Sequence, residues 1–252
     1  MNITEYRQHP ATSYSKLKAY LKSPLHGLMQ QPPAESAAMR FGSLVDLMMK
    51  DSTDFILNPH EDGRTKAAKE FKAANAGKLI VSEDEYNRAY KAVRSIKDHL
   101  AVQCLCLNLL EADKPLFGEI DGVQVKGLPD WWLDGTVIDL KTTASGIDAN
   151  SFAKNVDAYC YDLQAAVYCE LARQAGDANP TFFWIACESD SPHDVAVYKA
   201  TDRILEVGKA KLKKALENFK IGQSGQMLGI SQHINELEMP PWYGKAFQLD
   251  GF

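Results

Sequence analysis

Two acids and a lysine flank the most regular hairpin pattern in the chain. Apolar runs lie on both sides of Asp134-Gly135, and an Asp-Gly pair between such runs is typical of a two-residue β-turn. The predicted cross-strand pairs are Leu133 with Thr136, Trp132 with Val137, Trp131 with Ile138 and Asp130 with Asp139. Directly opposed residues share a face of the sheet, and Lys141 shares the face of Asp139 because side chains alternate along a strand. The pattern therefore predicts two adjacent carboxylates with an ammonium one step away.

These residue types could hold a metal ion. Two opposed carboxylates repel each other, so we expect a cation between Asp130 and Asp139. Mg²⁺ takes oxygen ligands, commonly one or two carboxylates together with waters and phosphate oxygens, and the carbonyl of Leu140 is placed to add a ligand. Lys141 is placed to orient or deprotonate an attacking water, or to stabilise charge that develops on a phosphate.

A second hairpin pattern precedes the first. Strands at 117–120 and 123–125 flank an Asp121-Gly122 turn, which sets Glu119 opposite Gln124. If the strands continue as one three-stranded meander, one face carries Glu119, Lys126, Asp130, Asp139 and Lys141. Gly127 and Pro129 leave a second register open, because either residue can mark a bulge that shifts the count by one.

The other elements predict an α/β fold with a central mixed sheet and a helical N-terminal part. We expect one domain over residues 1–252, with a mainly helical part at 1–110, a core at 111–222 and a tail at 223–252. The predicted helices lie at 13–22, 25–31, 39–50, 64–72, 82–110, 151–175 and 201–220, and further strands at 181–187 and 195–198. Residues 1–12 are expected to be irregular and 51–64 to be a loop. On the 151–175 helix, Gln164 and Tyr168 are four residues apart and so project from one face.

Composition excludes several classes of protein. The 252 residues carry a net charge of −5, which does not indicate a general nucleic-acid binder. A locally basic channel is still compatible with a negative net charge. No apolar run approaches the 18 or so residues of a membrane span, and no secretory signal is evident, so we expect a cytoplasmic protein. The five cysteines are expected to be reduced core thiols. Phosphate-loop, zinc-spacing and GxSxG patterns are absent from the sequence.

Several motifs together resemble a known nuclease superfamily. Pro129-Asp130 followed by Asp139-Leu140-Lys141 resembles the PD-(D/E)xK pattern, and Gln164 with Tyr168 resembles the QxxxY element of its RecB-type subgroup. Four further stretches resemble motifs of phage and prophage RecE exonucleases (exodeoxyribonuclease VIII type), and the resemblance spans roughly residues 13–200. These stretches are Asp139 to Thr143 (DxKTT), Ser23 to His26 (SPxH), Gly42 to Asp46 (GxxxH) and Arg64 to Lys69 (RTKxGK).

The resemblance implies an activity and a set of roles. It implies a PD-(D/E)xK nuclease fold and a Mg²⁺-dependent exonuclease, with Mn²⁺ as a substitute, that degrades one strand of linear duplex DNA from its 5′ end. The remaining 3′ strand would pass to a single-strand annealing protein for recombination, and the enzyme would form a trimeric or tetrameric ring in a bacterial or phage-infected cell. No iron–sulfur cluster is expected. The implied metal ligands are Asp46, Asp130, Asp139 and the Leu140 carbonyl; the catalytic set is Lys141, Asp130, Asp139, Glu119, Gln164 and Tyr168.

One departure and three alternatives accompany this interpretation. Position 46 is Asp where the RecE pattern has His, which keeps a hard oxygen ligand; by pattern alone, Asp46 could equally be an exposed helix acid. The alternatives are an endonuclease or single-strand nuclease of the same fold, a non-catalytic DNA-binding or assembly protein, and a small-molecule phosphohydrolase. Phosphate contacts are expected from Arg40, Arg64, Lys66, Lys126 and Lys154, although a solvated face also explains the basic helix.

Overall fold

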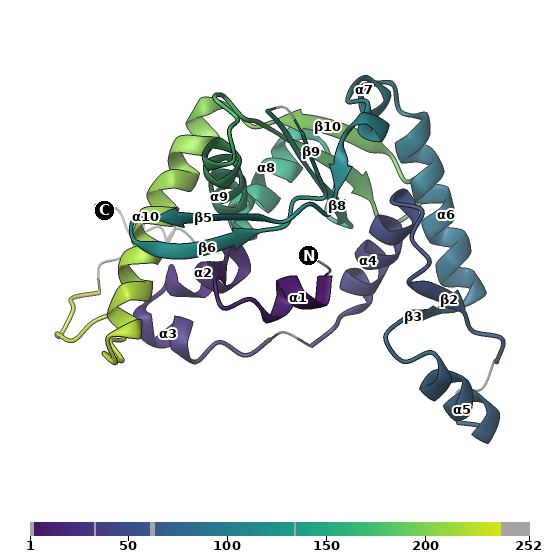
Figure 1. Ribbon diagram of the computed structural model, residues 1–252, viewed down its shortest axis with the longest axis horizontal. Helices are drawn as coiled ribbons and strands as arrows, with labels where there is room; N and C mark the ends of the chain where they lie inside the picture. The colour runs from purple at the N-terminus through teal and green to yellow at the C-terminus, as the bar shows by residue number, and fades with distance from the viewer. Residues whose placement is uncertain (1–2, 33, 61–63, 134, 238–252) are drawn as a thin grey trace, which may run out of the picture.

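A five-stranded mixed sheet forms the centre of the molecule (Figure 1). The computed structural model describes residues 3–32, 34–60, 64–133 and 135–237. The central strands are β4 Glu111–Ala112, β7 Trp131–Leu133, β8 Thr136–Thr143, β9 Thr181–Glu188 and β10 Val195–Lys199. Their order is β10-β9-β8-β7-β4, in which β8 and β9 are parallel and the other neighbours are antiparallel.

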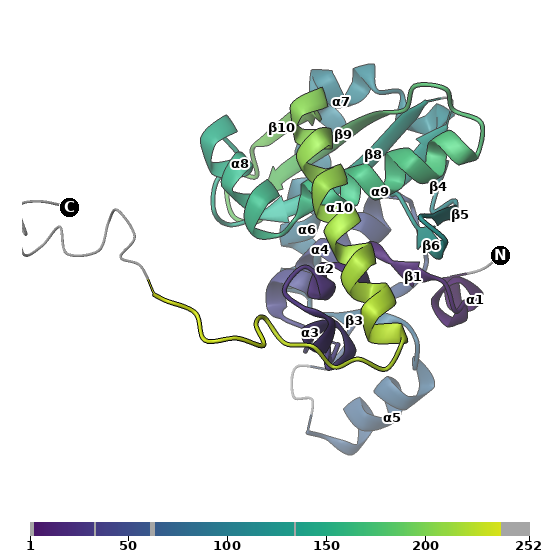
Figure 2. The same cartoon turned by 90° about the vertical axis from the view of Figure 1, so that its left-hand side faces the viewer.

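Helices cover both faces of this sheet (Figure 2). They are α1 Ile3–Gln8, α2 Tyr14–Tyr20, α3 Pro24–Leu28, α4 Ala37–Met49, α5 Lys66–Ala74, α6 Glu83–Asp98, α7 Leu100–Cys104, α8 Ala149–Ala158, α9 Tyr161–Gln174 and α10 Asp202–Gln223. Val137 and Trp184 pack into the core formed with α8, α9 and α10, whereas Ile138 and Ile185 pack into the core formed with α4, α6 and α7. Alternate strand residues are thus buried on opposite faces, as expected for a sheet enclosed by helices.

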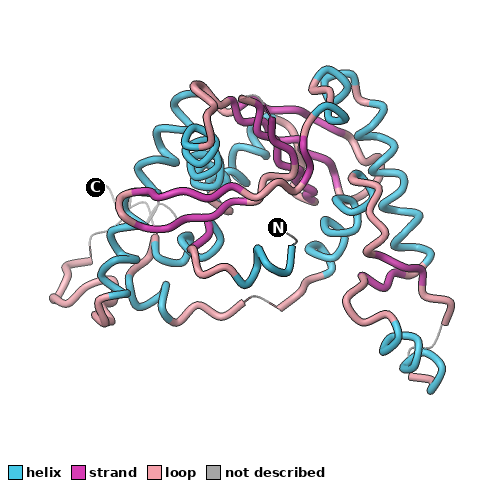
Figure 3. The backbone as a smooth tube through the Cα atoms, viewed as in Figure 1, coloured by secondary structure: helices cyan, strands magenta, loops and turns pink. Residues whose placement is uncertain are grey.

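Two smaller sheets extend from this body (Figure 3). The first has the order β1-β6-β5, from β1 Thr12–Ser13, β5 Leu116–Ile120 and β6 Val123–Gly127. The second pairs β2 Phe55–Leu57 with β3 Leu79–Val81 in parallel and carries α5 away from the body. None of the helices described is long and apolar enough to cross a membrane.

The predicted α/β class and most strand pairs are confirmed. Leu133–Thr136, Trp132–Val137, Trp131–Ile138 and Glu119–Gln124 are all cross-strand pairs. Asp134, half of the predicted turn, lies outside the described residues. The continuous meander is wrong, because β6 ends at Gly127 and β7 begins at Trp131 in a different sheet. A Cβ at Gly127 would lie 2.9 Å from the ring of Tyr168, so the chain leaves β6 tightly against α9.

Several predicted helix limits are corrected by the structure. The 151–175 helix is broken at Cys160, whose left-handed φ of 56° separates α8 from α9. The helix predicted over 82–110 ends at Asp98, although its capping box at Ser82 and Glu85 is confirmed. Residues 3–8 form α1 rather than an irregular arm, and the predicted 51–64 loop contains β2. Two- and three-residue strands have too few positions to show a period in the sequence.

Close packing of α9 against α10 gives a stability prediction. An Ala Cβ at Gly208 would lie 2.1 Å from the Asp162 carbonyl oxygen. Gly208→Ala should therefore destabilise the protein by about 1–3 kcal/mol, although an unconstrained helical Gly→Ala change stabilises by roughly 0.5–1 kcal/mol. Urea unfolding followed by circular dichroism measures the difference. The neighbouring exposed control Val207→Ala should change stability by less than about 0.5 kcal/mol; a stabilised Gly208→Ala variant would contradict the close contact.

Candidate metal and nuclease site

Asp139 lies in the middle of β8, against helix α9. Its side chain is buried, on the face of β8 opposite to that of Ile138. Gln164 Nε2 donates a 2.7 Å hydrogen bond to Asp139 Oδ1, and the Lys141 ammonium forms an ion pair with Oδ2. Lys141 Nζ also lies 4.7 Å from the centre of the Tyr161 ring, the first residue of α9. Because the helix breaks at residue 160, α9 begins where Tyr161 lies beside Lys141 and Gln164 contacts Asp139.

Asp130 lies just outside the β7–β8 ladder, which ends with the Trp131–Ile138 pair. It does not pair with Asp139 in the predicted register. Instead its Oδ2 accepts a 2.6 Å hydrogen bond from the Leu140 backbone N–H. Tyr168 donates from its hydroxyl to the Leu128 carbonyl at 3.2 Å, which ties the chain before Asp130 to α9. Asp130 thus lies at the sheet edge, reachable from both helical layers.

Three carboxylates meet at this edge. Asp46 comes from α4, Asp113 from the turn after β4 and Asp130 from the residue before β7. One oxygen of each lies within 4.8 Å of the others, a spacing that suits metal ligands. The Asp113 N–H donates to the Asp130 carbonyl at 3.2 Å, which fixes their proximity. A Cβ at Gly42 would lie 3.0 Å from Thr142 Oγ1, so α4 approaches β8 closely.

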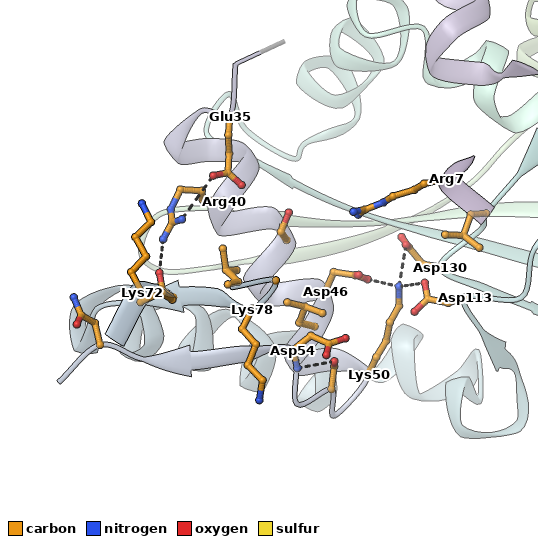
Figure 4. A pocket seen from close by; sticks show the side chains of 18 of the residues that line it. Arg7, Glu35, Arg40, Asp46, Lys50, Asp54, Lys72, Lys78, Asp113 and Asp130 are labelled. Atoms are coloured by element: carbon orange, nitrogen blue, oxygen red, sulfur yellow. Dashed lines mark hydrogen bonds and ion pairs between the residues drawn. The ribbon is translucent and has the colours of Figure 1, made fainter. Parts of the chain in front are cut away.

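A lysine ammonium lies among these three carboxylates (Figure 4). Lys50 Nζ is 2.6 Å from Asp46 Oδ1, 2.8 Å from Asp113 Oδ1 and 3.3 Å from Asp130 Oδ1. Its side chain is only 6% exposed, and its ammonium lies 5.5 Å from the centre of the Trp131 ring. Lys50 follows Asp46 by one helical turn, so a single segment of α4 supplies both charges.

Burial and crowding change the pKa values of these groups. Desolvation, then the charge of Asp130, raises the pKa of Asp46 to about 7. Desolvation likewise raises the pKa of Asp139 to about 6, against the opposing effect of Lys141 and with a further increase from Asp130. Burial lowers the pKa of both Lys50 and Lys141, but the neighbouring carboxylates more than offset it and the net shift is upward. Both lysines therefore remain ammonium ions that neutralise the acids.

The acids fit a hard divalent cation. Asp46 Oδ1 and Asp139 Oδ2 are buried, and each is ion-paired with one ammonium, that of Lys50 and that of Lys141 respectively. Buried anionic oxygens are costly without a cation beside them. Together with Asp130 they offer only oxygen donors, which suits Mg²⁺ or Mn²⁺ better than softer metals.

A cavity of about 940 Å³ opens onto the three carboxylates. Figure 4 shows Asp46, Asp113 and Asp130 at one end and Arg40 and Lys72 at the other. Lys78 and Arg7 also line it, and neither Lys72 nor Lys78 has an ion-pair partner in the described part of the chain. The cavity therefore joins an acidic end to a wall that carries cations.

The other predicted phosphate contacts are scattered. Arg40 lines the cavity, but its guanidinium is engaged by Glu35, Glu85 and the Ile80 carbonyl. Arg64, Lys66 and Lys154 are exposed, on or beside α5 and on α8.

Lys126 and Glu119 do not lie on the face with Asp130 and Asp139 that the predicted meander gave them. Lys126 is 7% exposed, and its ammonium donates to the carbonyls of Tyr6 (2.6 Å), Arg7 (3.3 Å) and His9 (2.8 Å). All three of its protons serve to hold α1, so the expected phosphate contact is corrected to a structural one. Glu119 is exposed on β5, in the other sheet, and accepts a 2.9 Å hydrogen bond from Gln124.

Two of the family-like stretches act as helix caps. Ser23 Oγ accepts from the His26 N–H, with Pro24 at the first position of α3. Thr65 Oγ1 accepts from the Ala68 N–H at the start of α5. The cysteines also differ from expectation: Cys169 and Cys187 are buried, but Cys104 and Cys106 are exposed.

Sequence reasoning missed Asp113 and Lys50. Asp113 follows the two-residue strand β4, which has no periodicity that could align it with Asp130. Lys50 stands four residues after Asp46, a spacing that predicts an ordinary helical ion pair and does not predict contact with two further acids.

Comparison with known proteins agrees with this architecture. Residues 13–231 match the family described as a PDDEXK-like domain of unknown function (DUF3799). The crystal structure of a Eubacterium rectale protein that carries the name putative exonuclease superposes with a TM-score of 0.66 at 17% identity, covering 99% of each chain. A phage related exonuclease from Haemophilus somnus 129PT gives a TM-score of only 0.37 at 11% identity, covering 88% of this chain and 99% of its own, and supports no conclusion. No protein with a curated description matches the chain.

The fold and the acids on and beside β8 therefore define a protein of the PD-(D/E)xK nuclease superfamily. Within it, the chain belongs to the PDDEXK-like DUF3799 family.

The contrast between Lys78 and Lys126 gives a second prediction. Lys78→Ala should reduce the salt dependence of duplex DNA binding by about one unit in the slope of log K against log salt concentration. Lys126→Met should leave that slope unchanged, because its ammonium is used by three carbonyls. Fluorescence anisotropy at several salt concentrations measures both. An equal loss of slope in Lys126→Met would show that this ammonium also contacts phosphates, contrary to its three hydrogen bonds to carbonyls.

Proposed function

We propose that the protein is a divalent-metal-dependent deoxyribonuclease that hydrolyses phosphodiester bonds from the 5′ ends of linear duplex DNA. The observation that carries this proposal is the grouping of Asp130, Asp139 and Lys141 around the middle of β8, with Gln164 fixing Asp139. A non-catalytic binding module would have no need for carboxylates crowded so closely that buried ammonium ions must offset their repulsion.

The metal would be held by Asp130, Asp139 and the Leu140 carbonyl, with Asp46 completing the set from α4. When bound, the ion supplies a Lewis acid that polarises a phosphoryl oxygen and lowers the pKa of a water. Gln164 keeps Asp139 in one orientation through its 2.7 Å hydrogen bond. Tyr168 acts at a distance, by holding the Leu128 carbonyl and so the chain that leads to Asp130.

Lys141 would act as a cation. The upward shift of its pKa, in spite of burial, favours the ammonium over the free amine. An ammonium can orient a water and stabilise negative charge on a phosphate, but it cannot accept a proton. Of the roles considered for Lys141, charge stabilisation and water orientation therefore fit better than proton abstraction.

An extended polyanion fits the cavity better than a small phosphate ester. The cavity is open, and its wall carries Lys72 and Lys78, which have no ion-pair partner among the described residues. Cations along a groove suit the backbone of a nucleic acid strand, whereas a small-molecule phosphohydrolase encloses its substrate.

The polarity of digestion and the assembly follow from the resemblance to RecE exonucleases. We propose that Mg²⁺ is the working ion, that the chain forms a trimeric or tetrameric ring around DNA, and that the 3′ strand passes to a single-strand annealing protein. Glu119 has no role in this proposal, because it lies on the other sheet.

Loss of the charge of Asp139 or of Lys141 should nearly abolish hydrolysis. Asp139→Asn removes a metal ligand at constant shape, and Lys141→Met removes the ammonium; each should lower the rate of Mg²⁺-dependent DNA hydrolysis by roughly 10²–10⁴-fold. The measurement is release of labelled nucleotides, with circular dichroism to confirm folding. The exposed matched controls Glu206→Ala and Lys199→Met should retain wild-type rates. Retained activity in either site variant would remove that residue from the mechanism.

Substrate form distinguishes the candidate activities. With Mg²⁺, 5′-labelled linear duplex should lose its label before 3′-labelled duplex, closed circular duplex should stay intact, and chelation of the metal should stop the reaction. Gel analysis over time measures all four. Cutting of the closed circle would instead identify an endonuclease, preferential digestion of single strands would identify a single-strand nuclease, and inactivity with both Mg²⁺ and Mn²⁺ would favour a binding module.

A further inference from the structure

Lys50 lies where the acids of the proposed metal site converge. Its ammonium contacts one oxygen of each of Asp46, Asp113 and Asp130, at 2.6–3.3 Å. Asp46 and Asp130 are two of the proposed metal ligands, so the lysine and a metal ion would draw on the same negative charge. A second ammonium, that of Lys141, neutralises Asp139. In the described part of the chain it forms no ion pair with the other three acids.

An ammonium and a divalent ion cannot lie close together without a large repulsion. Two like charges about 4 Å apart interact unfavourably by several kcal/mol at the effective dielectric of a protein surface. A metal that binds Asp46 and Asp130 would therefore displace Lys50 or bind more weakly in its presence. The contacts that now stabilise Lys50 would be lost at the same time.

The structure gives Lys50 another position to occupy. Its side chain lines the acidic cavity and also a second cavity of about 530 Å³, between the end of α4 and helices α6 and α7. Trp131 lines the second cavity, and the Lys50 ammonium already lies 5.5 Å from the centre of its ring. A change of side-chain rotamer could keep the ammonium over this aromatic face.

We propose that Lys50 is a resident counter-cation that occupies the acid cluster in the metal-free protein and competes with the divalent ion for Asp46 and Asp130. It sets the metal concentration at which the site fills and keeps the empty site folded. This role rests on the proposed function, since it presumes a divalent ion at these acids. A purely structural ion pair would tie α4 to the sheet edge without affecting metal affinity.

Titration of the chelator-treated full-length chain with Mg²⁺ and Mn²⁺ by isothermal calorimetry tests this role. Lys50→Met keeps a long unbranched side chain without charge, and it should bind the ion on the order of tenfold more tightly at unchanged stoichiometry. In chelator, its melting temperature should fall below that of the wild type, because three acids are left without a cation. Saturating metal should raise the melting temperature more in the variant than in the wild type.

Lys97→Met is the matched control. Lys97 lines the second cavity and is 45% exposed, 3.5 Å from Asp51, but it contacts none of the three acids in the described structure. It should show wild-type metal affinity and no enlarged metal response. Lys50→Gln, which retains donor groups without charge, repeats the test if Lys50→Met does not fold.

Equal or weaker metal binding by the Lys50 variants would overturn the proposal, as would failure of both variants to fold with or without metal. A wild-type protein that binds no divalent ion would instead overturn the metal dependence of the proposed function. Equal affinity in the wild type and in Lys50→Met would overturn the competition and leave the metal dependence of the proposed function intact.

Discussion

Crowded negative charge at the edge between β7 and β8 is the constraint on which the rest of the site depends. Asp46, Asp113 and Asp130 meet there, and Asp139 lies one strand residue from the Leu140 N–H that binds Asp130. Such a group of acids is stable only when cations offset the repulsion and the loss of hydration. Lys50 and Lys141 supply two positive charges, and the residual tendency of Asp46 and Asp139 to take up protons shows that the compensation is incomplete.

The two helical layers divide this task between them. α9, on one face of the sheet, positions Asp139 through Gln164 and the approach to Asp130 through Tyr168. α4, on the other face, brings Asp46 and Lys50 to the same edge. Asp130 can contact groups of both helical layers because it lies just beyond the last cross-strand pair, outside the alternation of side chains along the strand. Because the short β7 begins one residue after Asp130, this acid lies outside the β7–β8 ladder.

The surroundings of the acids distinguish them from a structural ion-pair network. Their oxygens open onto a large cavity, and cations lie at its other end. Helix α5 and strand β3 line one side of this cavity, and α5 projects from the body (Figure 1). A net charge of −5 thus coexists with a local basic wall, because the field that a strand of nucleic acid meets depends on nearby groups and not on the sum.

By itself, the sequence determined what local chemistry can specify. The Asp-Gly hairpin set the Trp131–Ile138 register, period-two alternation placed Lys141 beside Asp139, and helical spacing aligned Gln164 with Tyr168. Only the tertiary structure decided that Asp113 and Lys50 lie beside Asp46 and Asp130. It also decided that the Lys126 ammonium hydrogen-bonds to carbonyls of the N-terminal segment and that Glu119 belongs to another sheet. The physical reason is range: hydrogen-bonded turns and side-chain periods act over a few residues, whereas these contacts join segments 63 to 120 residues apart that are brought together by packing on both faces of the sheet.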